Sequence, residues 1–144
     1  MKPGRVLAVL LLSFASILHA QDNSDKDKIE AAGKAAQSWL ALVDAGKYDQ
    51  SWDEASAMLK EKVSKEQWKD AMTRVRDPLG KSASRKLERA QLTTKLPGAP
   101  DGVYVVIQYT SKYEKLADAI DTVIPKLETD GKWRVAGFFI KPAE

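Results

Sequence analysis

The spacing of apolar residues changes between residues 75 and 85, and this change limits the fold more than any other feature. Between residues 28 and 75, apolar side chains recur every three or four positions, which is the period of an amphipathic helix. From residue 85 onward they alternate, and the run VYVVIQYTSKYE at 103–114 has the strongest strand composition in the chain. We therefore expect helices first and strands afterwards.

Helix-capping and helix-breaking residues divide the first half of the chain into three expected helices. The first begins at Lys28 and ends at Gly46, because glycine suits a left-handed position after a helix. The second spans Tyr48–Ala57. The third begins at Ser64, which with Gln67 three residues later has the spacing of a capping box, and Pro78 ends it.

The second half predicts four strands joined by short turns. The strands are expected at 85–95, 103–114, 119–128 and 132–141. Clustered proline and glycine at 97–102 and the pair Asp130-Gly131 mark turns. Short connections favour an antiparallel meander, so the fold class is α+β, with about three N-terminal helices on one face of a four-stranded sheet. Residues 28–144 form one domain, preceded by a flexible segment at 21–27.

Alternation assigns each strand two faces. On the helix side it places Val105, Ile107 and Tyr109 of the second strand, Asp121 of the third, and Trp133, Val135, Gly137 and Phe139 of the fourth. Pro125 lacks an amide hydrogen, so we expect a β-bulge beside it.

The opposite face of the sheet carries an apolar set that predicts a homodimer interface. Its members are Tyr104, Val106, Ile120, Ile124, Phe138 and Ile140. Two alternatives stay open. In the first, the apolar set is covered by the N-terminal segment and by the aliphatic stems of Lys112, Lys126 and Arg134. In the second, a bulge at Pro125 or Gly137 turns Phe138 and Ile140 inward.

Residues 1–20 have the layout of a secretory signal peptide. Lys2 and Arg5 precede an apolar run that is too short to span a bilayer comfortably, and a polar segment follows Ala20. We expect cleavage after Ala20 and export to the periplasm or the medium, with no stable membrane span after cleavage. An uncleaved anchor is the alternative.

Cleavage after Ala20 would remove the single histidine, His19, from a chain that has no cysteine. The mature protein then lacks the residues for Ser-His-Asp triads, Cys-His pairs and most transition-metal sites, so no metal or cofactor is expected. Nucleic acid is not an expected partner, because no binding motif is present.

Two stretches carry a resemblance to a known family. LPGAPDGVYVVIQYTSKYEK at 96–115 and DTVIPKLETDGKWRVAGFFIK at 121–141 resemble exported bacterial proteins grouped as domain-of-unknown-function family 4019. The resemblance implies no activity. Its order of elements is similar to the nuclear-transport-factor-2-like (cystatin-like) fold, which implies a curved, cone-like sheet.

A carboxylate that faces the cavity of such a cone would be the strongest candidate for a functional residue in the chain. Asp121, with Tyr109 and Trp52, is the candidate ligand-binding set, and no catalytic residue is identified. We expect a non-enzymatic module that binds a partner or small ligand. The alternative is a cofactor-free isomerase or lyase that uses Asp121 as a base. The aromatic residues, Trp39, Tyr48, Trp52, Trp68 and Trp133, favour a packed core over a ligand pocket.

Charge is unevenly distributed along the chain. Residues 21–59 hold 4 basic and 8 acidic residues, whereas residues 60–95 hold 11 basic and 5 acidic residues. The basic segment either contacts anionic lipid or another polyanion, or pairs with the acidic N-terminal helix inside the molecule, and the second interpretation is favoured.

Overall fold

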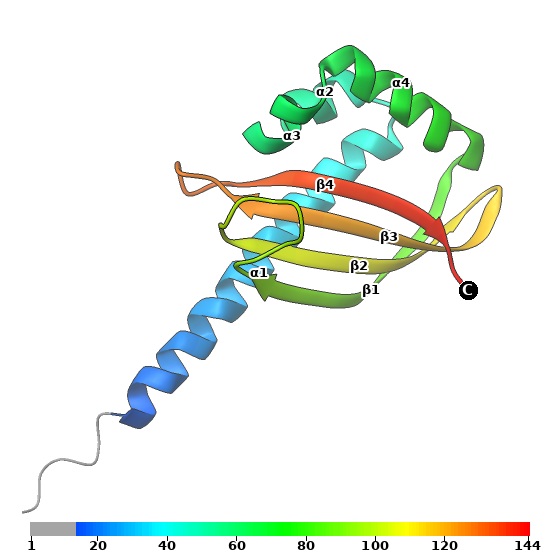
Figure 1. The fold of residues 1–144 in the computed structure, drawn as a ribbon. Coiled ribbons are helices and arrows are strands. Elements are labelled where there is room, and N and C mark those ends of the chain that lie inside the picture. The colour runs from blue at the N-terminus through cyan, green and yellow to red at the C-terminus, as the bar shows by residue number, and fades with distance from the viewer. Residues whose placement is uncertain (1–13) are drawn as a thin grey trace, which may run out of the picture.

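A computed structural model describes residues 14–144, with side chains from Gln21 onward (Figure 1). Within this range four α-helices and a 3₁₀ turn precede four strands. The helical elements are α1 (Phe14–Asp44), α2 (Tyr48–Asp53), α3 (Ala57–Lys62), α4 (Lys65–Val75) and η1 (Asp77–Leu79). The strands are β1 (Ser82–Thr93), β2 (Tyr104–Tyr113), β3 (Leu116–Leu127) and β4 (Trp133–Pro142).

The strands form one antiparallel sheet in the order β1-β2-β3-β4, which confirms the meander and the α+β class. Helix α1 crosses one face of this sheet, and α2, α3 and α4 lie beyond the β4 side (Figure 1). Gly131 at the β3–β4 turn has a φ of 80°, a left-handed conformation that glycine adopts readily, so the predicted Asp130-Gly131 hairpin is confirmed.

The number and bounds of the helices differ from the prediction. The second expected helix ends at Asp53, and a separate helix, α3, follows. The Ser56 side chain caps α3 by accepting a hydrogen bond from the Leu59 amide at 3.3 Å. A helix of six residues is too short to show a helical period, which is why periodicity missed it. The capping box at Ser64 is confirmed.

The expected start of the first helix at Lys28 is also wrong, because residues 21–27 belong to α1. Ion pairs one turn apart join Lys26 to Asp22 at 3.2 Å and Lys34 to Glu30 at 2.7 Å, and such pairs support an exposed helix. The flexibility predicted for 21–27 stays a prediction. Residues 1–13 of the predicted signal peptide lie outside the described residues, and of 14–20 only the helical backbone is described.

No helix within the described part of the chain combines the length and apolarity needed to cross a membrane.

The core lies between α1 and the sheet. The indole of Trp39 on α1 packs against the rings of Trp68 and Phe138, with centroids 5.9 and 5.4 Å away. Ser51 links the helices, because its carbonyl accepts from Trp39 Nε1 at 2.8 Å and its hydroxyl accepts from Trp68 Nε1 at 3.0 Å. These contacts satisfy the indole donors inside the protein, so the interpretation of these aromatic residues as core is confirmed.

A bulge inverts the faces of β4 halfway along the strand. Ile124 pairs with Gly137 and Pro125 with Val135, which leaves Ala136 as an extra residue and confirms the irregularity expected beside Pro125. Beyond it, Phe138 pairs with the buried Val123 and turns inward, whereas Phe139 is 61% exposed.

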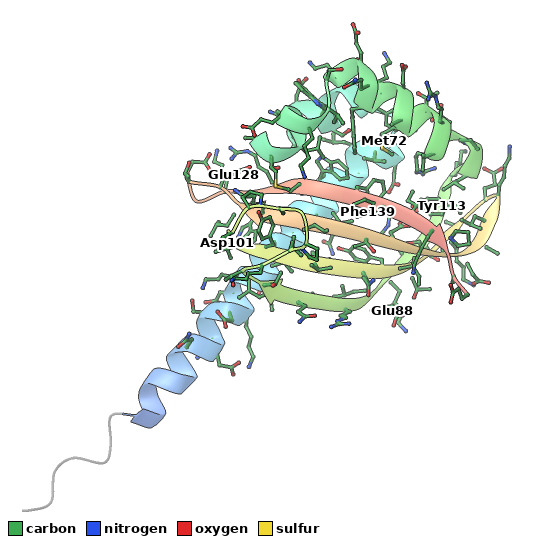
Figure 2. All side chains as sticks on the ribbon, in the orientation of Figure 1. Met72, Glu88, Asp101, Tyr113, Glu128 and Phe139 are labelled. Atoms are coloured by element: carbon green, nitrogen blue, oxygen red, sulfur yellow. The ribbon has the colours of Figure 1, made fainter. Side chains whose placement is uncertain are left out.

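The prediction that Gly137 and Phe139 face the helices is therefore wrong, and so is the placement of Phe138 and Ile140 on the outer face. The physical reason is the one inserted residue, since side-chain direction in a strand has a period of two. Figure 2 labels Phe139 on β4, and the side chain of this residue is exposed.

Candidate functional site

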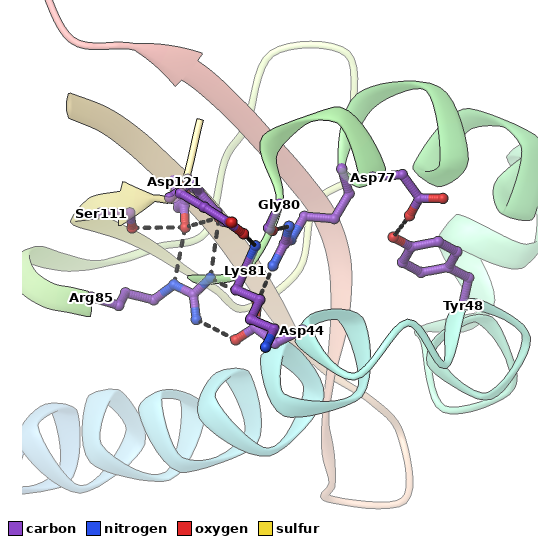
Figure 3. A network of polar contacts seen from close by, with 11 residues as sticks. Asp44, Tyr48, Asp77, Gly80, Lys81, Arg85, Ser111 and Asp121 are labelled. Carbon is purple, nitrogen blue, oxygen red and sulfur yellow. Dashed lines mark hydrogen bonds and ion pairs between the residues drawn. The ribbon is translucent and has the colours of Figure 1, made fainter. Parts of the chain in front are cut away.

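Asp121 lies at the centre of a buried polar network between β3, β2 and β1 (Figure 3). Its side chain is completely buried. Its Oδ2 atom accepts three hydrogen bonds, from Ser111 Oγ at 2.7 Å, Tyr113 OH at 2.7 Å and Arg85 Nε at 3.0 Å. Charged and hydroxyl donors on one oxygen hold the carboxylate in a fixed position.

Arg85 connects this carboxylate to the last residue of α1. Its two terminal nitrogens donate to the Asp44 carboxylate at 2.8 and 3.2 Å, in the forked geometry that arginine favours. Burial lowers the pKa of Arg85, but the hydrogen bonds and charge of Asp44 outweigh burial and raise that pKa above its ordinary value. Arg85 is therefore a permanent cation between two carboxylates.

Arg76 completes the network from the end of α4. Its guanidinium lies over the Tyr113 ring at 4.6 Å, approaches Asp44 Oδ1 at 3.3 Å and donates to the Gly80 carbonyl. The four charged groups, Asp44, Arg76, Arg85 and Asp121, balance in sign. This arrangement fastens the end of α1 and the α4–β1 connection to the middle of the sheet.

Two tyrosines at the network, Tyr113 and Tyr48, remain protonated at neutral pH and so cannot act as bases. Burial, followed by the hydrogen bond to Asp121, raises the pKa of Tyr113 well above its usual range. Tyr48 donates to Asp77 beside the network, and burial together with that bond raises the pKa of Tyr48 to about 12. At neutral pH both hydroxyls keep their protons and can only donate or accept hydrogen bonds.

The structure brings together two of the three predicted ligand-binding residues. Asp121 and Tyr109 are direct partners in the β2–β3 register. Trp52 lies on α2, where its Nε1 donates to the Val63 carbonyl at 2.9 Å and its ring lies 5.3 Å from Lys65 Nζ. Trp52 is therefore part of the helical layer and not of the Asp121 site.

An open groove of about 200 Å³ leads toward the network from outside. It lies between α1 and β1, and its polar lining residues are Gln37, Asp44, Arg85 and Tyr109. Asp121 itself is not among the residues that line it. A molecule in this groove would meet the Arg85–Asp44 ion pair, which separates it from the Asp121 carboxylate.

Asp121 Oδ1 and Arg76 Nε are buried and have no hydrogen-bond partner among the described residues. Oδ1 is the carboxylate oxygen that Ser111, Tyr113 and Arg85 leave free. A base at this position would have to act through that atom, and the atom is shielded from solvent.

The sequence interpretation missed most of the network, although one signal could have found part of it. Continuing the helix-facing alternation of β2 past Tyr109 gives Ser111 and Tyr113, the two hydroxyls on Asp121. The predicted pairing of the basic segment with the acidic N-terminal helix is confirmed for two basic residues, since Arg76 and Arg85 pair with Asp44 at 3.3 and 2.8 Å. Two further pairs, Lys65–Asp53 at 2.6 Å and Lys69–Asp49 at 3.5 Å, join the basic segment to α2.

The described side chains, from residue 21 onward, contain no group of three histidine, cysteine, aspartate or glutamate residues placed to hold a metal ion.

The outer face of the sheet is partly covered by the β1–β2 loop. Tyr104 is fully buried there, and its hydroxyl donates to the Pro100 carbonyl at 2.6 Å. Of the predicted dimer face, Val106, Ile120 and Ile124 remain half-buried on this side. The homodimer stays a prediction. Its predicted face no longer includes Phe138 and Ile140, which turn inward, and Tyr104 is covered by the β1–β2 loop.

Beside this loop lies an open apolar groove of about 270 Å³. Met58 and Lys62 of α3, Leu96 and Pro97 of the loop, and Ile124 and Phe139 of the sheet contribute to it.

Comparison with family models gives a match to "Protein of unknown function (DUF4019)" over residues 35–138. This range includes the whole Asp121 network and all of the sheet except the end of β4. No curated protein matches the chain.

Proposed function

This chain belongs to the DUF4019 family, whose description names no activity, and we propose that it is an exported module that binds a partner or small ligand without catalysing a reaction. The family membership confirms the resemblance to this family seen in the sequence, and the similarity to the cone-like fold stays a prediction. The membership leaves the function to be inferred from the geometry of the molecule.

The closure of the Asp121 site is the observation that carries this proposal. The one carboxylate that sequence reasoning selected for chemistry is fully buried, with three donors on one oxygen. Substrates need a catalytic base within hydrogen-bond reach, and here the Arg85–Asp44 pair stands between the groove and the carboxylate. The network therefore supports the fold, and the open apolar grooves at the surface are left for binding.

Export is part of the same proposal and rests on residues 1–20. Their short cationic start, apolar run and polar continuation favour a cleaved signal peptide and a periplasmic or secreted protein. After cleavage at Ala20, α1 would begin in its exposed, ion-paired segment, and the packed part of the helix would be unchanged.

The alternative function is a cofactor-free isomerase or lyase. One observation favours it: Asp121 Oδ1 is buried without a partner, and Tyr113 reaches the same carboxylate with a hydroxyl that could donate to a substrate. The alternative requires Arg85 to leave Asp121 so that the groove between α1 and β1 opens onto the carboxylate.

Native mass spectrometry of the exported protein, purified without denaturation, tests the proposal. We expect the mass of residues 21–144 together with an added mass from a retained ligand or partner, and the same added mass in an Asp121→Asn variant. A mass that keeps residues 1–20 would contradict export. The mature mass alone in every preparation would contradict the proposed binding. An added mass lost from an Asp121→Asn variant that is still folded would contradict binding away from Asp121.

A further inference from the structure

The two edges of the sheet differ in how they are protected. Free strand edges invite pairing with other chains, and proteins guard them with charges and bulges. The β1 edge has both, because its register shifts between Leu87 and Arg89, and Lys86, Glu88 and Arg89 are exposed. The β4 edge beyond its bulge reads Gly137-Phe138-Phe139-Ile140, a run without a charge.

The residue that caps helix α3 is bonded to the start of the β4 edge. The Ser56 amide donates to the Val135 carbonyl at 2.8 Å, and this bond is where the helical layer meets the strand. Among residues 14–144, no other segment forms a backbone hydrogen bond with the stretch from Gly137 to Ile140 except its neighbour β3. The backbone groups on that side of the stretch are left for another strand.

Two apolar grooves lie on either side of this free edge. On the helix side, a groove of about 250 Å³ lies between Trp68, Ala71 and Val75 of α4 and Phe138 and Ile140 of β4. On the outer side lies the groove of about 270 Å³ beside the β1–β2 loop. Phe139 borders both grooves and is 61% exposed, and Val75 is 51% exposed.

We propose that the β4 edge binds an extended peptide segment of a partner protein, which adds a fifth strand beside Gly137–Ile140. This inference rests on the proposed binding function and names its partner class. Successive side chains of an extended strand point to opposite faces, so alternate residues of the peptide enter the helix-side and the outer groove. Main-chain hydrogen bonds to the free edge supply the rest of the recognition.

Charge favours acidic residues beside the apolar core of the peptide. Lys62 lines the outer groove and Lys141 follows Ile140, and neither forms an ion pair within the described part of the chain. A second copy of this chain fits less well. A two-fold axis beside β4 would place both α4 helices on the same face over the joined edges, because α4 flanks β4.

Selection from a phage-displayed library of random peptides tests the inference on the mature protein. We expect enriched peptides to have an apolar run flanked by aspartate or glutamate. A synthetic copy of the most enriched peptide should slow amide hydrogen exchange at 137–140. The same peptide with proline at alternate core positions should not bind, because proline removes the amide donors.

The chain offers matched variants for this test. Phe139→Lys and Val75→Lys should each weaken peptide binding about tenfold or more, the loss expected when a buried apolar contact is removed. Leu87→Lys is the control, because Leu87 is 56% exposed on the opposite edge and should leave binding unchanged. All three positions are exposed, so the variants should fold.

Equal weakening by Leu87→Lys, equal binding of the proline peptide, or no enriched peptide would overturn the inference. The inference would also be overturned if the wild type self-associates and Phe139→Lys abolishes that self-association, because the edge would then bind a second copy of this chain. If no peptide binds but a partner is still retained in native mass spectrometry, only this inference fails. If neither is found, the proposed binding function fails too.

Discussion

Asp121→Ala is expected to lower the free energy of unfolding by about 3–5 kcal/mol, the cost of breaking a buried ion pair. The change removes the acceptor of three donors at once, Arg85 Nε, Ser111 Oγ and Tyr113 OH. Arg85 keeps Asp44 but loses its buried counter-charge, and two hydroxyls lose their partner. A domain of this size has a total stability of about 5–15 kcal/mol, so the loss is a large share of it.

The urea midpoint, at unchanged slope, measures this loss, and Asp130→Ala is the matched control. Asp130 also forms a forked ion pair with an arginine, at 2.8 and 3.0 Å from Arg134, but at an exposed turn. We expect the midpoint of Asp130→Ala to stay near that of the wild type, because exposed pairs contribute little. Equal midpoints for the two variants would show that the Asp121 network does not stabilise the fold.

Phe138→Ala is expected to destabilise the protein by about 3 kcal/mol, the lower end of the range for a core phenylalanine, since Phe138 is only partly buried. Its ring packs edge-on against Trp39 at 5.4 Å. Phe139→Ala, one residue further, should change stability by no more than about 0.5 kcal/mol, because that side chain is 61% exposed.

The same urea titration compares the two phenylalanine variants, and it tests the bulge directly. Without the extra residue at Ala136, Phe139 would face the helices and the two effects would be exchanged. A larger loss for Phe139→Ala would therefore show that β4 keeps a regular alternation.

Local signals in the sequence were enough to predict the order of the elements. The Ser64–Gln67 capping box, the turn at Asp130-Gly131 and the alternation of β2 each act within a few residues, and each is found in the structure. The bulge beside Pro125 was predicted, and its effect, an inward turn of Phe138 and Ile140, was one of the alternatives left open. Pro125 is on β3 and the extra residue is on β4, so the sequence of one strand does not specify which partner absorbs the shift.

The candidate site was less predictable because its parts are distant in sequence. Alternation placed Asp121 on the buried face correctly. Its counter-ion Arg85 is on β1 and is fixed by Asp44 at the end of α1, and this geometry depends on how α1 crosses the sheet. A charge count favoured pairing between the basic segment and the acidic N-terminal helix, but it did not indicate which pair would be buried.

Carboxylate labelling of the native protein tests most directly the claim that Asp121 supports the fold and is closed to substrates. Treatment with a carbodiimide and glycine ethyl ester, followed by peptide mass spectrometry, compares Asp121 with the exposed Asp101 and Asp130. We predict that Asp101 and Asp130 are modified in the native protein and that Asp121 is modified only after unfolding in urea. Modification of native Asp121 at the rate of Asp130 would show an open carboxylate and contradict the account.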